Sequence, residues 1–412
     1  MAYIHQISRK SLLASTAVLL MISQNVSAAD SLQEAVQDGR IYLNVRVRYE
    51  NVDQANFVKN ATALTMRTRF GYKTGSFKGF SGVLEMEDTR NLANENYNNT
   101  LNGKGAIYPV IADPSQTEVN QAYLSYSGIE GTKISGGRQS INLGTQRFVG
   151  TVGWRQDDQN LDAVTVVNKS LPNTKIFYAY VWNVNRIFSD RSPAGDHASR
   201  TNLLNVEYSG LKFGKLTTYA YLLNNRSVAA FSSNTFGIRF AGKTKIADKT
   251  NILYEAEYAN QTDAHNNPAS FSVNYFNISG GLGFSGAVVK AGLESLGSDN
   301  NGTASFKTPL ATLHKFNGWA DQFLATPAAG LEDLYFTGIY KFGGQLHGLK
   351  ALATYHKFTS QFGNTDYGKE LDLLLAYKIN KNYSVAAKYA DYNADSWKVD
   401  VRKLWFLLGI KF

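Results

Sequence analysis

The chain has 412 residues, no cysteine and a formal net charge of +9. The lack of cysteine excludes a disulfide framework and a thiolate metal site, and the small basic excess does not by itself indicate a nucleic-acid partner. Tyr (24) and Phe (23) far outnumber Trp (5) and Met (4), Gly is abundant (35) and Pro is scarce (7). This balance suits a transmembrane β-barrel, whose strands keep their amide donors and whose rims carry amphipathic rings.

The N-terminal segment has the layout of an export signal. The basic residues Arg9 and Lys10 precede a mostly apolar run over residues 11–22, and small residues follow it. The run is shorter than the roughly 20 residues that a membrane-spanning helix needs. We therefore expect a removed signal peptide over residues 1–29 and a single barrel domain over residues 30–412.

The rest of the chain consists of successive strands. In residues 41–50, IYLNVRVRYE, every second residue is apolar, and this period of two predicts a strand with one apolar and one polar face. Similar segments recur to the C-terminus, so we predict eighteen strands, an even number as in a closed bacterial barrel. The further segments are 62–72, 80–88, 120–127, 132–139, 161–168, 174–182, 203–209, 215–223, 235–241, 251–259, 272–282, 287–295, 333–342, 349–358, 369–379, 382–392 and 402–412.

The connections between these segments alternate in length. Short turns alternate with longer connections at 89–119, 140–160, 183–202 and 296–332, as periplasmic turns alternate with extracellular loops in outer-membrane barrels. The loops 140–160 and 296–332 are rich in aromatic and charged residues, and we expect them at the extracellular side or folded into the barrel mouth. A propeller or solenoid would show a repeat of fixed period, and none is evident. A soluble sandwich remains the alternative fold.

The polar faces of the first two strands carry Arg46, Arg48, Arg67 and Arg69. A charge on the lipid face costs roughly 2–4 kcal/mol near the bilayer midplane, so we expect these side chains to face the lumen. Two interpretations are open: a generic lining in which acids and bases pair, or a basic ladder that passes an anionic solute through weak contacts at many sites. The arginine cluster favours the ladder, because guanidinium binds carboxylates bidentately. Further charged residues with the same expected orientation are Glu85, Glu87, Arg138, Asp162, Arg239 and Lys290.

No motif marks a catalytic, metal or cofactor site. The six histidines show no metal-ligand spacing. Residues 237–244, GIRFAGKT, match the phosphate-loop pattern, but they lie in an alternating strand and no amphipathic helix follows. We therefore predict no catalytic residue, metal or cofactor, while a barrel hydrolase and a general small-solute porin stay open as alternatives.

Two long segments resemble the bacterial outer-membrane alginate export family: GGRQSINLGTQRFVGTVGWRQDDQNLDAV (136–164) and FKTPLATLHKFNGWADQFLATPAAGLEDLY (306–335). The shorter stretches MRTRFGY and EVNQAYLSY also fit, and the likeness runs from about Gly39 to Phe412. It implies an eighteen-stranded barrel in a Gram-negative outer membrane, with a cationic pore for alginate, a polyuronate. The motif match implies that the pore-lining or constriction residues include Arg69, Arg138, Arg147, Arg155 and Asp162.

The resemblance and the C-terminal strand also imply partners. The final strand alternates and ends on Phe412, which resembles the signal that the barrel assembly machinery recognises. The expected partners are thus that machinery, outer-membrane lipid and an anionic polysaccharide or oligosaccharide, without nucleic acid. The expected function is an anion-selective channel.

Overall fold

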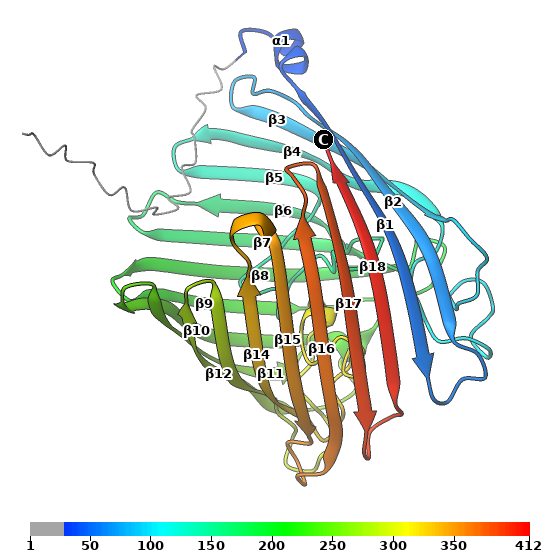
Figure 1. Cartoon of the computed structure of the whole chain (residues 1–412). Helices are drawn as coiled ribbons and strands as arrows, with labels where there is room; N and C mark the ends of the chain where they lie inside the picture. The colour runs from blue at the N-terminus through cyan, green and yellow to red at the C-terminus, as the bar shows by residue number, and fades with distance from the viewer. Residues whose placement is uncertain (1–28) are drawn as a thin grey trace, which may run out of the picture.

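The computed structural model describes residues 29–412, in which eighteen strands form one closed antiparallel sheet (Figure 1). The barrel closes where β1 (Arg40–Gln54) pairs with both β2 (Ala61–Lys73) and β18 (Val401–Lys411). At this seam the amides and carbonyls of Leu43 and Phe412 exchange hydrogen bonds of 3.0 and 2.9 Å. The predicted barrel class and strand number are confirmed. Apart from Ala29, the expected signal peptide lies outside the described residues.

The other strands match the predicted segments, with bounds extended at several ends. β8, for example, begins at Asp196, whereas the apolar pattern predicted a start at 203, because the alternation marks only the part of a strand that crosses the apolar belt. The remaining strands are β3 (Phe80–Asn91), β4 (Gln116–Ile129), β5 (Thr132–Gln139), β6 (Asn160–Asn168), β7 (Thr174–Asn185), β8 (Asp196–Leu211), β9 (Gly214–Leu223), β10 (Ser233–Ala247), β11 (Thr250–Asp263), β12 (Ser272–Phe284), β13 (Ala287–Leu296), β14 (Leu331–Lys341), β15 (Leu349–Thr359), β16 (Asp366–Lys378) and β17 (Tyr383–Ala394).

Helical structure is sparse in the described residues, 29–412. A six-residue helix, α1 (Leu32–Gln37), precedes the barrel, and three single 3₁₀ turns lie in connections: η1 (Ala229–Phe231), η2 (Leu313–Lys315) and η3 (Gly344–Leu346). Within residues 29–412 no helix has the length and apolar character needed to cross a membrane.

The two ends of the barrel differ. Helix α1, the C-terminus and the short turns lie at one end, and the long connections lie at the other (Figure 1). Short turns mark the periplasmic end of such barrels, so the long loops belong to the extracellular side. The turn 285–286 is typical of the short ones: Ser285 and Gly286 both have positive φ (43° and 90°), as tight hairpin turns require.

The two faces of the strands separate apolar from charged side chains. Large apolar residues such as Phe70, Leu124 and Phe406 point outward and are more than half exposed, whereas Glu85 and Glu87 are buried inside. An apolar belt facing outward is what contact with lipid requires. The phosphate-loop pattern at 237–244 lies wholly within β10 and is a coincidence.

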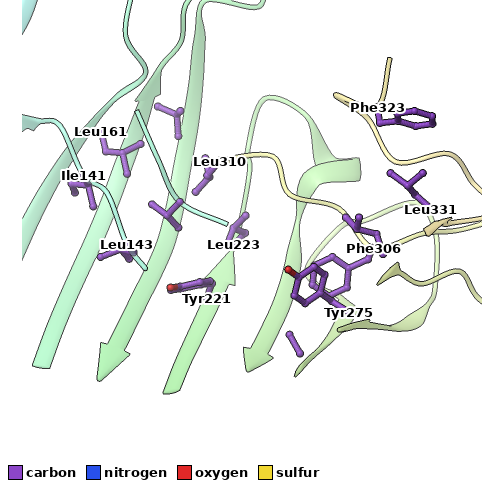
Figure 2. Close-up of a cluster of buried hydrophobic side chains, with 14 of the residues drawn as sticks. Ile141, Leu143, Leu161, Tyr221, Leu223, Tyr275, Phe306, Leu310, Phe323 and Leu331 are labelled. Carbon is purple, nitrogen blue, oxygen red and sulfur yellow. The ribbon is translucent and has the colours of Figure 1, made fainter. Parts of the chain in front are cut away.

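Three long connections fold into the barrel and fill its extracellular half. These are loop 92–115, loop 140–159 and loop 297–330, whose apolar residues, such as Ile111, Val149 and Phe306, pack in one buried cluster with the wall. Figure 2 shows Phe306 and Leu310 of loop 297–330 among side chains of the wall, including Tyr221 and Tyr275. The interior is therefore a packed core at this level and an open lumen only in part.

Candidate pore lining and constriction

The arginines of β1 and β2 point into the barrel, and the register places Arg46 directly opposite Arg67. Arg48 is 0 % exposed and Arg67 5 % exposed. Like charges directly opposite on neighbouring strands destabilise a sheet, so these guanidinium groups need partners.

Arg48 finds its partners in acids. It forms ion pairs with Asp113 of loop 92–115 and with Glu50, the latter at 3.5 Å. Both carboxylates are buried, so this group is compensated within the barrel wall and contributes little net charge to the lumen.

Arg69 is likewise compensated. It pairs with Glu87 of β3 and with Asp158 of loop 140–159 at 2.6 Å. Glu85, which the sequence also suggested as a screening acid, instead accepts hydrogen bonds from Asn120 at 2.6 Å and Gln121 at 3.1 Å. The second acid that compensates Arg69 is therefore Asp158 of loop 140–159, and not Glu85.

Arg46 and Arg67 have only neutral partners. Arg46 donates to the carbonyl of Gly153 at 2.8 Å, to the carbonyl of Arg155 and to Gln156 Oε1 at 3.0 Å. Arg67 donates to Asn44 Oδ1 at 2.6 Å. Among residues 29–412 no carboxylate lies within ion-pairing distance of either guanidinium, so two positive charges remain uncompensated here.

These arginines border a cavity of about 810 Å³, which we call the basic cavity. It also reaches the turn around Asn380 and Lys381, so it lies toward the periplasmic end. Its lining contains no Asp or Glu among the described residues, and its basic members are Arg46, Arg67, Arg69, Lys350, Lys378, Lys381 and Lys411.

A second cavity, of about 400 Å³, has the opposite character, and we call it the acidic cavity. It lies between loop 297–330 and strands β11 to β16. Its basic members are Lys290 and Lys315, and its acidic members are Glu255, Glu257, Glu294, Asp333 and Asp372.

Arg239 and Lys290, which strand alternation predicted to face the lumen, and Arg147, which the resemblance implied, belong to this acidic region. Arg239 pairs with Glu255 at 2.8 Å, and Arg147 of loop 140–159 pairs with Glu294 at 2.7 Å. Lys290 Nζ lies 5.6 Å from the ring centroid of Tyr335. The structure therefore does not bring all the predicted bases into one ladder.

Arg138 and Asp162 form a third location. They are opposite each other in the β5–β6 register, and Arg138 Nε donates to Asp162 Oδ1 at 2.9 Å. They line a cavity of about 650 Å³ that also includes Glu118. This pair is locally neutral.

Arg155 lies where loops 140–159 and 297–330 meet the barrel wall. Its Nη1 lies 3.1 Å from Glu50 Oε2 of β1, and its Nη2 lies 3.4 Å from Asp321 Oδ2 of loop 297–330. Asp321 also pairs with Lys403 of β18 at 2.7 Å. Arg155 thus ties loops 140–159 and 297–330 to the wall and to each other.

Loop 297–330 is fixed by its backbone amides as well. The amide of Trp319 donates to Asp372 Oδ2 at 3.2 Å, and that of Ala320 donates to Glu370 Oε1 at 2.6 Å. Gly318, with φ of +83°, precedes them, and a Cβ at this position would clash with the Glu370 carboxylate. Two buried wall acids are therefore occupied in holding the loop.

Beside this loop, aromatic rings surround the ammonium group of Lys388 of β17. Lys388 Nζ lies 4.0 Å from the Trp154 ring centroid, 3.6 Å from that of Trp319 and 2.5 Å from His314 Nε2. Burial, aided by the charge of Lys388, lowers the pKa of His314 to about 3. The imidazole is therefore neutral at working pH, accepts from Lys388 and donates from Nδ1 to Asp321.

Two buried Asp–His pairs bear on the hydrolase alternative. His314 and Asp321 are 2.7 Å apart, and His356 and Asp333 are 2.8 Å apart. In the part of the chain that the structure describes, no serine hydroxyl bonds to either imidazole. Both pairs instead anchor the core of the constriction.

Several lining residues were not singled out from the sequence. Lys350, Lys378 and Lys411 lie at inward positions of alternating strands, so the pattern that marked Arg46 could have marked them. The loop acids Asp113, Asp158 and Asp321 follow no period, and only their place in the fold pairs them with strand arginines.

Comparisons with known proteins agree with this geometry. The family model described as "Alginate export" matches residues 40–285. Similar solved structures are Acinetobacter baumannii OccAB4 (TM-score 0.73, 12 % identity, 91 % of this chain and 98 % of that chain) and Pseudomonas aeruginosa OpdK with vanillate (TM-score 0.72, 14 % identity, 92 % and 99 %). No curated protein matches the sequence.

The solved structures share this fold over nearly their full length. With its outward apolar belt and closed eighteen-stranded wall, the protein is a channel of the Gram-negative outer membrane. The family match spans more than half of the chain, and the protein belongs to the alginate export family.

Proposed function

We propose that this channel passes an anionic polysaccharide or oligosaccharide, alginate first among them, along the basic cavity. The observation that carries the proposal is a lining of seven basic side chains without an acid, named above. The uncompensated Arg46 and Arg67 sit at its inner end. Export of a polymer and uptake of its fragments would use the same path.

The chemistry of a polyuronate suits this lining. Alginate carries one carboxylate per sugar ring, and side chains two residues apart on one strand face are about 7 Å apart. At that separation a unit charge in water contributes about 0.6 kcal/mol. Several such contacts attract a polyanion, while none is strong enough to hold it in place.

The test is ion selectivity and block in planar bilayers. The native channel should prefer anions in a salt gradient, and oligouronates should block its current at lower concentration than neutral oligosaccharides of equal length. Arg46→Ser with Arg67→Ser should reduce the anion preference roughly two- to tenfold. The matched control, Arg90→Ser with Arg402→Ser, removes two outer-surface arginines and should leave selectivity unchanged.

Cation preference in the native channel, or equal block by neutral and uronate oligosaccharides, would contradict the proposal. A second candidate solute is a small carboxylate, because one structurally similar channel was solved with vanillate. That candidate predicts passage of vanillate into liposomes while oligouronates are excluded. The proposal further includes recognition of β18, which ends next to Phe412, by the barrel assembly machinery.

A further inference from the structure

Three carboxylates meet where loop 140–159 touches the barrel wall. Glu87 and Glu118 are direct partners in the β3–β4 register, and Asp157 approaches them from the loop. One oxygen of each lies within 4.8 Å of the other two. Glu87 is 1 % and Asp157 0 % exposed, and like charges opposite on neighbouring strands destabilise a sheet. This arrangement therefore needs a compensating positive charge.

The protein itself supplies little of that charge. Arg69 binds only the Oε2 atom of Glu87, and across residues 29–412 no cation forms an ion pair with Asp157 or Glu118. Burying an unpaired carboxylate is strongly unfavourable. The cluster thus has a net negative charge that its neighbours leave uncompensated.

Some buried oxygens of the cluster have no hydrogen-bond partner. Glu87 Oε1 and Asp157 Oδ1 are buried and accept no hydrogen bond. Gln116, which is 7 % exposed, donates from Nε2 to Asp157 Oδ2 at 2.5 Å, and its own Oε1 also has no partner. Two buried carboxylates of the cluster, those of Glu87 and Asp157, therefore each have an oxygen without a hydrogen-bond partner.

We propose that Glu87, Glu118 and Asp157 bind one divalent cation of the calcium type. Calcium takes six to eight oxygens at about 2.3–2.6 Å, so two ligands of one ion are at most about 5 Å apart. The 4.8 Å limit within the cluster meets that condition. Magnesium keeps several waters and is usually held by one or two carboxylates, so a largely buried cluster of three suits it less well.

The cation has a route to the site. Glu118 is half-buried and lines the cavity of about 650 Å³ that also contains Asp190 and Asp196, beside the neutral Arg138–Asp162 pair and Arg186. Carboxylates along a cavity attract cations, and an entry path is a requirement for any metal site.

The ion would fix the constriction. Asp157 is followed by Asp158, which pairs with Arg69, and preceded by Gln156, which bonds to Arg46. An ion at Asp157 would therefore hold loop 140–159 to β3 and β4, next to its contacts with the arginines of β1 and β2.

The experiment uses the full chain, purified in detergent and freed of divalent ions with EDTA. Calorimetric titration with calcium chloride should show one site per chain, and calcium should raise the unfolding temperature by a few degrees. Asp157→Asn and Glu118→Gln should each weaken calcium binding at least tenfold. Asp248→Asn, which changes an exposed carboxylate in a short turn, is the matched control and should bind as the native chain does.

A shared proton is the competing explanation. It predicts no calcium binding by the native chain and a higher unfolding temperature for Asp157→Asn without any ion, and this result would overturn the proposal. Equal calcium affinity in the native chain and in Glu118→Gln would overturn it as well. If Asp157→Asn does not fold, the calcium affinity of Glu118→Gln, a change at a half-buried position, tests the proposal instead.

Discussion

The basic and acidic cavities are both lined by strands of alternating pattern, but their charges are compensated differently. In the acidic cavity Arg239 pairs with Glu255, and Glu294 pairs with Arg147. In the basic cavity Arg46 and Arg67 bond only to neutral oxygens. Paired buried charges mainly fix structure, whereas unpaired charges set the potential in the lumen.

The two cavities also differ in what covers them. Residues 315–319 of loop 297–330 line the acidic cavity, while the basic cavity reaches the short turns at the periplasmic end. A solute that enters from the periplasm meets the basic lining first. This difference supports the proposal that the bases act on the solute, whereas Asp372 of the acidic cavity holds loop 297–330.

The largest effect should follow from removing the link between the loops. Arg155→Ala leaves Glu50 and Asp321 without this partner, and breaking a buried ion pair costs about 3–5 kcal/mol. We expect loop 140–159 to detach, so that trypsin cleaves it in the folded barrel and single-channel conductance rises.

The control for this change removes the opposing charge as well. Arg155→Ala with Glu50→Gln leaves one buried carboxylate fewer without compensation, and it should recover part of the protease resistance. Conductance and cleavage identical to the native channel in Arg155→Ala would show that the loop is held by other contacts.

A smaller effect should follow from inverting charge in the basic cavity. Lys350→Glu with Lys378→Glu changes the lining by four units of charge, and at about 0.6 kcal/mol per unit this is about 2.4 kcal/mol, so the anion preference should fall roughly fiftyfold or reverse. Reversal potentials in a salt gradient measure it.

Two further variants test whether the change in anion preference depends on the size and on the place of the charge change. Lys350→Gln with Lys378→Gln should give about half the change in free energy, and Lys369→Glu, on the exposed face of β16, should give none. A native reversal potential in the doubly inverted channel would place the conducting path away from the basic cavity.

The strands and their faces could be predicted from the sequence because period two is a local property. Alternation alone placed Arg46 and Glu85 on the inner face. It does not give the height of a side chain along the pore or its neighbours after closure, and for this reason Arg239 was expected in a ladder that it does not join. Lys411 becomes a neighbour of Asn44 only when β18 pairs with β1.

The ion pairs between the loops and the wall were less predictable, because the acids that pair with the arginines lie in loops. Asp113, Asp158 and Asp321 are separated from their arginines by many residues, and no spacing rule connects them. The resemblance to a family identified Arg147 and Arg155 as lining residues, but not the carboxylates that pair with them. Their pore-lining role therefore remains a prediction, which the experiments on the two cavities address.

The smallest effect is expected for a single charge in the acidic cavity. Glu257 accepts a hydrogen bond from Tyr219 at 2.9 Å and lies 3.7 Å from Arg239, which Glu255 also holds. In Glu257→Gln the amide oxygen can still accept from Tyr219, so the fold should persist while one negative charge is lost. Because this cavity is covered by loop 297–330 and salt screens charges beyond about 8 Å, we expect the anion preference to rise less than twofold.

Lys378→Gln, an equal change in the basic cavity, is the comparison, and its fall in anion preference should be larger. Reversal potentials recorded for both variants in the same salt gradient decide the matter: an effect of Glu257→Gln equal to that of Lys378→Gln would mean that the acids act on the solute as directly as the bases do.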